Sequence, residues 1–179
     1  MIIRRRNLLV AAVAALLPLG IAVPASATAS GVSTASITVL AGALSISVPT
    51  GAGVLGTLTD SVGGGTISGP LGQVQVSDAR SAAAGSGWVA SVISSAFTPL
   101  TGTAIAASAV GYTAGPITKV GTATYTANDP GDLTGVSPAV TATGITGDNS
   151  ATWNPTITVA VPGGMAATSY FATITHSVV

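Results

Sequence analysis

The sequence predicts an all-β protein: a single antiparallel β-sandwich of short strands, placed after a cleaved N-terminal signal helix. Three observations lead to this fold class. Apolar and polar residues alternate with a period of two in many short stretches. Turns rich in glycine and proline separate these stretches at short intervals. No segment beyond the amino terminus keeps the apolar period of a capped helix.

The first 27 residues have the order of a secretory signal peptide. Residues 4–6 are all arginine, an uninterrupted apolar run covers residues 8–17, and small residues occupy positions 25–27. The apolar run is far shorter than the roughly 20 residues that span a bilayer. We therefore predict a signal peptide over residues 1–27 and one domain over residues 28–179. The arginines fit general secretion as well as twin-arginine export.

Few charged side chains remain once the predicted signal is removed. They are two bases, Arg80 and Lys119, and five aspartates, which give a formal charge of −3. Two cations cannot neutralise a row of phosphates, so nucleic acid is excluded as a partner. They also form no polybasic patch for a membrane after signal cleavage. The chain has no cysteine, which excludes disulfides, zinc thiolates and thiol catalysis.

The expected strands follow one another along the chain with period-two patterns. They cover residues 37–39, 44–48, 74–76, 88–93, 120–127 and 140–145. The clearest pair comes last, where residues 157–161 and 170–174 flank a turn at residues 162–164 and predict a hairpin. No repeat of fixed period is present, which argues against a solenoid, a propeller or a regular threonine array for binding ice.

Groups that could carry out catalysis are scarce. The sequence holds one histidine, no glutamate and no Gly-x-Ser-x-Gly nucleophile elbow. His176 has the parity of Tyr170 and Ile174, so we interpret it as a partly exposed strand residue. Asp129 and Asp132 could act as paired carboxylates, but the Pro-Gly pair between them is typical of a turn. We predict that the protein is not an enzyme.

Four side chains offer the hard oxygen ligands that calcium prefers. These are Asp129, Asp132, Asp148 and Asn149. Their spacing matches neither an EF-hand loop nor a calcium-binding nonapeptide repeat. We therefore expect no metal ion and no other cofactor.

Two tryptophans carry a family resemblance. Trp88 lies in Gly-Ser-Gly-Trp-Val-Ala-Ser-Val, shortly after Val-Gln-Val-Ser-Asp-Ala-Arg, and Trp153 opens the predicted C-terminal hairpin. From about residue 71 to residue 179 this arrangement resembles the WxL domain of Gram-positive surface proteins. Ala90 and Pro155 stand where that family has leucine. The chain is therefore similar to a divergent, actinobacterial-like member of the family.

The resemblance implies a β-sandwich that attaches noncovalently to peptidoglycan and cooperates with other surface proteins. An exposed Trp or Tyr ring can stack on a sugar, whereas a buried one belongs to the core. On a strand, residues 78 and 80 share a face, so they could bind a ligand or form a local ion pair. The candidate ligand-binding residues are Trp88, Trp153, Asp78, Arg80, Tyr112 and Tyr170.

Two functions follow as expectations. The first is a secreted module, at the cell wall or in the extracellular space, that binds peptidoglycan or another cell-wall polymer noncovalently. The second is a structural subunit or adhesin that assembles with itself or with another surface protein, because weakly charged strand edges do little to prevent pairing. No Leu-Pro-x-Thr-Gly sorting signal is present, so we expect the folded domain itself to hold the protein at the wall.

Overall fold

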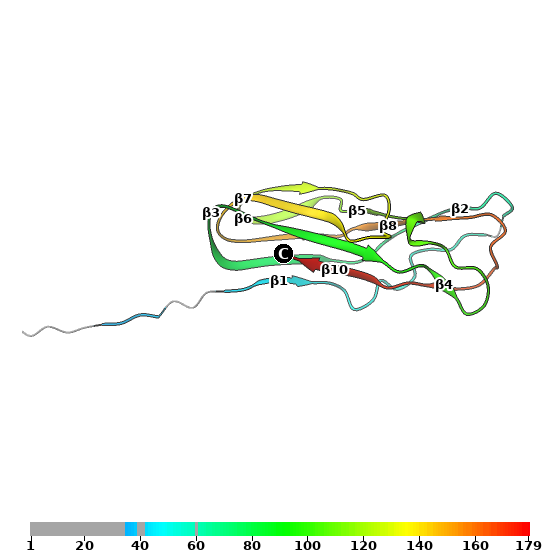
Figure 1. Cartoon of the computed structure of the whole chain (residues 1–179), viewed down its shortest axis with the longest axis horizontal. Helices are drawn as coiled ribbons and strands as arrows, with labels where there is room; N and C mark the ends of the chain where they lie inside the picture. Colours follow the sequence, from blue (N-terminus) through cyan, green and yellow to red (C-terminus); the bar gives the residue numbers. More distant parts are fainter. Residues whose placement is uncertain (1–34, 39–41, 60) are drawn as a thin grey trace, which may run out of the picture. The chain divides into compact units, whose positions relative to one another are not determined.

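A computed structural model of the chain describes residues 35–38, 42–59 and 61–179. By its internal contacts the chain divides into two units, Met1–Thr38 and Val39–Val179. The predicted signal peptide lies outside the described residues, and residues 35–38 have no regular structure. The second unit is all-β with antiparallel sheets packed against each other, as the sequence predicts (Figure 1). In the part of the chain that is described, no helix could cross a membrane.

Three antiparallel sheets make up the described part of the second unit. The large sheet has the order β1-β3-β7-β6, with β10 also paired to β3: β1 (Leu44–Ser47), β3 (Val74–Ser94), β7 (Ser137–Trp153), β6 (Ile117–Ala127) and β10 (Ile174–Val178). The three-stranded sheet has the order β2-β8-β5: β2 (Gly65–Pro70), β8 (Thr156–Val161) and β5 (Val110–Thr113). The smallest sheet pairs β4 (Thr98–Pro99) with β9 (Tyr170–Phe171), and one 3-10 turn, η1 (Ala107–Ala109), precedes β5.

The large sheet turns a corner in the middle of β3 and β7, which are longer than the short strands that we expected. The register between the two strands shifts repeatedly between Asp78 and Trp88. Positive φ angles gather at this corner, at Ser81, Gly85, Gly121, Gly144 and Gly147. Bulges of this kind bend a strand from one layer of a sandwich into the other. Figure 1 shows β3 turning round, so that its two halves face each other.

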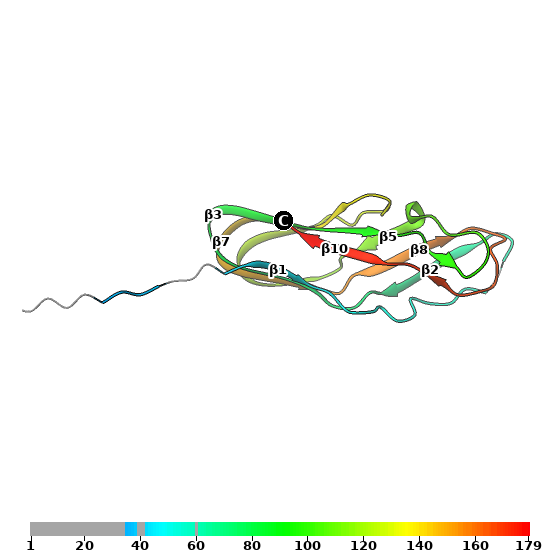
Figure 2. The same cartoon turned by 60° about the horizontal axis from the view of Figure 1, so that its bottom comes forward.

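The core fills the space between these two halves. Alternate residues of β3 are buried on both sides of the corner: Val74 and Val76 before it, and Trp88, Ala90 and Val92 after it. The same edge of β3 pairs with β1 before the corner and with β10 after it. Figure 2 shows β10 close to β1, in agreement with their contacts. The corner therefore closes one end of the sandwich.

The predicted C-terminal hairpin does not form. β8 pairs with β2 and β5, whereas Tyr170–Phe171 pairs with β4 and Ile174–Val178 pairs with β3. Two physical reasons explain why the hairpin is not formed. A loop over residues 162–169 replaces a tight hairpin turn, and alternating apolar patterns match several partners equally well. The two halves of the expected hairpin therefore enter different sheets.

Candidate functional site

Three of the predicted binding residues are buried aromatic side chains. Trp88 and Trp153 are each 2% exposed, and Tyr112 is 1% exposed. All three point inward because they have the parity of the buried positions on β3, β7 and β5. Their rings present no face on which a sugar could stack. The structure therefore assigns these three residues to the core and corrects their assignment to a binding surface.

Trp153, Tyr112 and His176 form a chain of hydrogen bonds. The indole Nε1 of Trp153 donates to Tyr112 Oη at 2.7 Å, and Tyr112 Oη lies 3.2 Å from His176 Nε2. Because the indole is only a donor, the tyrosine hydroxyl is free to donate to Nε2 of a neutral imidazole. Burial lowers the pKa of His176 to about 4. The histidine thus links β10 to the core and is a weak base.

Asp78 and Arg80 form an ion pair at the corner. The guanidinium donates from Nε to Asp78 Oδ1 at 2.8 Å and from Nη2 to Asp78 Oδ2 at 2.9 Å. The same Nη2 also donates to the carbonyl of Gly87 at 3.3 Å. Asp78 is 1% exposed, whereas the Arg80 side chain is 38% exposed. The hydrogen bonds from Arg80 hold the pKa of the Asp78 carboxyl below its usual value.

Asn149 connects this ion pair to two aromatic rings. Its Oδ1 accepts a hydrogen bond from Trp88 Nε1 at 3.0 Å and lies 3.2 Å from the hydroxyl of Tyr125. The rings of Trp88 and Tyr125 are tilted against each other, with centroids 5.7 Å apart. Asn149 is buried and Tyr125 is partly exposed. The buried Trp88 and Asn149 therefore hold the outer ring, that of Tyr125, in place.

Both cations of the predicted mature chain belong to this region. Lys119 is exposed, and its Nζ lies 5.8 Å from the centroid of the Tyr125 ring, a cation–π distance. Together these side chains form what we call the corner cluster: Asp78, Arg80, Trp88, Lys119, Tyr125 and Asn149. Sequence reasoning missed Lys119, Tyr125 and Asn149 as members. The scarcity of cations was the one signal that could have pointed to Lys119.

The remaining candidates lie elsewhere. Tyr170 is partly exposed, donates to the carbonyl of Ala166 at 3.0 Å, and lines a groove away from the corner. The aspartates considered for calcium instead accept hydrogen bonds from backbone N–H groups: Asp129 from Ala114, Asp132 from Thr134 and Asp148 from Ser81. No group of three or more potential metal-ligating side chains occurs among the residues that the structure describes.

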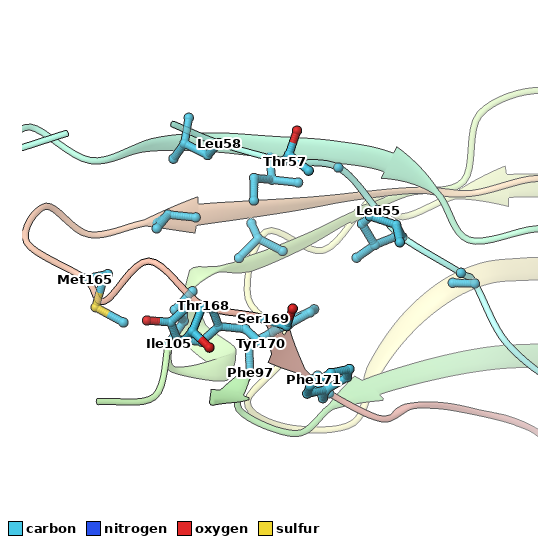
Figure 3. A pocket seen from close by; sticks show the side chains of 18 of the residues that line it. Leu55, Thr57, Leu58, Phe97, Ile105, Met165, Thr168, Ser169, Tyr170 and Phe171 are labelled. Atoms are coloured by element: carbon cyan, nitrogen blue, oxygen red, sulfur yellow. The ribbon is translucent and has the colours of Figure 1, made fainter. Parts of the chain in front are cut away.

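The groove has a volume of about 650 Å³ and is lined by apolar and hydroxyl side chains (Figure 3). The three-stranded sheet contributes Ile67, Val159 and Val161. Two segments without long strands form the sides, residues 49–58 and residues 165–174. Figure 3 shows side chains of the two segments lying across the groove from each other. None of the described residues that line the groove is charged.

Comparison of the chain with protein-family models, with curated proteins and with solved structures gave no match. The resemblance to WxL domains therefore stays a prediction from sequence pattern. The structure itself offers two places for a partner, the corner cluster and the groove, and they differ in chemistry. The corner cluster is polar and cationic, whereas the described residues that line the groove are apolar or carry hydroxyl groups.

Proposed function

We propose that the protein is a secreted cell-surface module that binds a cell-wall polymer such as peptidoglycan noncovalently, through the corner cluster. One observation carries this proposal. Arg80 and Lys119, the only cations of the predicted mature chain, lie beside a partly exposed tyrosine ring that a buried hydrogen-bond network holds in place. Residues 28–179 contain no other lysine or arginine that could attract an anionic ligand.

The cluster has the chemistry that recognition of a wall polymer needs. The flat apolar face of the Tyr125 ring suits the C–H face of a sugar ring, which is amphipathic. The guanidinium of Arg80 and the ammonium of Lys119 can donate to hydroxyl, amide or carboxylate oxygens. Asp78 fixes the guanidinium through two parallel hydrogen bonds. A site whose groups are fixed before binding loses less conformational entropy when the ligand arrives.

The burial of Trp88 changes which ring is expected to contact the ligand. Trp88 lies beneath Tyr125 and shares Asn149 with it as a hydrogen-bond partner. We therefore assign stacking to Tyr125 and a positioning role to Trp88. We propose no enzymatic activity, because His176 is bonded to a buried tyrosine and its pKa of about 4 makes it a weak base at neutral pH.

A sedimentation assay with purified peptidoglycan tests the proposal. We expect the wild-type protein to sediment with the polymer at moderate salt, and Tyr125→Ala and Lys119→Gln each to stay largely in the supernatant. Val120→Gln is the matched control, because Val120 is an exposed neighbour of Lys119 in β6, with the opposite parity. A wild-type protein that fails to sediment, or variants that bind as it does, would contradict the proposal.

The second candidate function is a structural subunit or adhesin that assembles with itself or with another surface protein. Pairing through the free edge of β6 has little support, because the bulge at Gly121 and the charge of Lys119 interrupt that edge. A different observation favours assembly. Several apolar side chains are exposed around the groove, and this surface is the subject of the next subsection.

A further inference from the structure

We infer that the groove binds residues 35–40 of a second copy of this chain as an added strand. The groove is separate from the corner cluster, so this inference does not depend on wall binding. It rests on three properties of the groove and on the pattern of one segment of the chain. The contact would join unlike surfaces of two identical molecules.

The first property is backbone hydrogen-bonding capacity. Residues 50–58 run along one side of the groove outside any strand, and none of them forms a backbone hydrogen bond with another described residue. This segment packs over β2, since the carbonyl of Leu55 lies against Gly69 and the side chain of Leu58 against Gly65. Unpaired N–H and C=O groups beside an apolar surface are what an added strand pairs with.

The second property is exposed apolar surface. Val54, Leu58 and Phe171 all line the groove and are 82%, 39% and 66% exposed. Burial of such side chains stabilises a complex by about 25 cal/mol for each Å² of apolar area removed from water. Apolar side chains gathered at one groove therefore indicate a surface that a partner covers.

The third property is the chemistry of the described lining. Among the described residues, every lining side chain is apolar or carries a hydroxyl group. An ionised side chain placed there would lose its water without gaining a partner of opposite charge. The occupant is therefore an uncharged segment with apolar side chains on one face.

Residues 35–40 of the chain have this character. Their sequence is Ala-Ser-Ile-Thr-Val-Leu, which has no charge, and its period-two pattern places Ile37 and Val39 on one face. In the described part of this segment, residues 35–38 belong to no strand and Ile37 is 90% exposed. Val39 and Leu40 lie outside the described residues. In an extended conformation the six residues span about 20 Å, with one face turned toward the groove.

The position of the groove determines the kind of assembly. β1 begins at Leu44, which pairs with Asp78 beside the corner, and the groove begins where β1 has ended, at Pro49. The donor segment leads into β1, and donor and acceptor are different surfaces. Contacts between different surfaces of identical subunits need not close, so repetition produces rings or open filaments.

Disulfide trapping tests the contact, because the natural chain has no cysteine. Protein from the full coding sequence would be prepared as two single variants, Ile37→Cys and Phe171→Cys, then mixed and oxidised. The matched control mixes Ile37→Cys with Leu100→Cys, since Leu100 is 90% exposed but does not line the groove. We expect a linked heterodimer in the first mixture, in clear excess over the control.

Sedimentation velocity gives a second measurement. We expect the wild-type protein to associate as its concentration rises, Ile37→Asp and Phe171→Asp to lose that association, and Leu100→Asp to keep it. Equal trapping in both mixtures, or a wild-type monomer at every concentration, would overturn the inference. So would an intramolecular disulfide in the double variant Ile37→Cys/Phe171→Cys, because the segment would then occupy its own groove. Phe171→Asp should still bind peptidoglycan, which separates this test from that of wall binding.

Discussion

The corner and the groove differ in how well their side chains are packed. At the corner, Trp88 is 2% exposed and the polar atoms around it are paired through Asp78, Arg80 and Asn149. At the groove, Val54 and Phe171 remain 82% and 66% exposed. Among the described residues, no buried side-chain nitrogen or oxygen lacks a hydrogen-bond partner.

The comparison shows that the side chains at the corner are packed against one another, whereas apolar side chains at the groove remain open to solvent. The corner is well packed, because Trp88 is covered and the buried polar groups around it are satisfied, so it can display Tyr125 and the two cations. The groove is incomplete, because apolar side chains and unpaired backbone line an open space. Substitutions of buried residues should therefore lower the stability of the fold, and substitutions of exposed residues at the groove should weaken association.

The largest effect is expected from Trp153→Ala. It removes a buried indole and the donor to Tyr112, and the free energy of unfolding should fall by about 4 kcal/mol. Urea denaturation followed by circular dichroism measures this fall. Trp153→Phe keeps most of the ring and should lose less. A loss below about 1 kcal/mol for Trp153→Ala would show that this part of the core is looser than its burial indicates.

The second largest loss of stability is expected from Asp78→Asn. It removes the charge that pairs with Arg80, and the free energy of unfolding should fall by about 2 kcal/mol at pH 7. The pKa of Asp78 is lowered in the folded state, so its contribution is present above the unfolded pKa and is lost as the pH falls through the folded pKa. Denaturation curves of both proteins should therefore converge in strong acid. A pH-independent gap would locate the effect in packing rather than in charge.

The next largest effect is expected when the pH is lowered, because the free energy of unfolding depends on the protonation of His176. Its pKa is about 4 in the folded protein, below the value of 6.5 that is usual for an unperturbed histidine. Between these values the unfolded state binds a proton that the folded state does not. Stability contributed by the neutral form should be complete above pH 6.5 and fall by about 1.5 kcal/mol toward pH 4, after allowance for partial exposure.

His176→Gln is the control for this titration. Glutamine offers an acceptor oxygen for the Tyr112 hydroxyl but does not titrate. The difference in unfolding free energy between pH 6.5 and pH 4 should therefore shrink in this variant. If wild type and variant show the same pH dependence, another group is responsible.

The smallest effect on stability is expected from Phe171→Ser. The side chain is 66% exposed, so the free energy of unfolding should change by less than about 0.5 kcal/mol. Thermal unfolding of dilute protein checks this expectation. A large loss would mean that Phe171 supports the monomer, and the contrast between the two ends would then disappear.

The sequence predicts the strands well and their partners poorly. Period-two patterns indicate strands at residues 44–48, 88–93 and 120–127, and the structure has strands there because alternation is a local property. Glycine at residues 85 and 87 suggests a turn between strands, yet β3 runs through the corner as one 21-residue strand. Bulges depend on the opposing strand, which local sequence does not specify.

The candidate site shows the same limit. Alternation reveals that Trp88 shares a face with Ala90 and Val92, but not whether that face is covered. Asn149 meets Trp88 from 61 positions away in the chain, a contact set by the register of β3 with β7. Tyr125 lies within a predicted strand, but its relation to Trp88 depends on that same register. Distant pairings, rather than residue types, determine which ring is exposed.

The central place of β3 has a consequence for how the protein reaches its fold. β10 pairs with residues of β3 that precede it by at least 80 positions, and β7 contributes further distant pairs. Folds dominated by contacts between distant residues form slowly. Because synthesis proceeds from the amino end, β3 is made long before β10, and its edge near Ala90–Ser94 stays open in the meantime. This domain therefore cannot complete its large sheet until β10 has been synthesised.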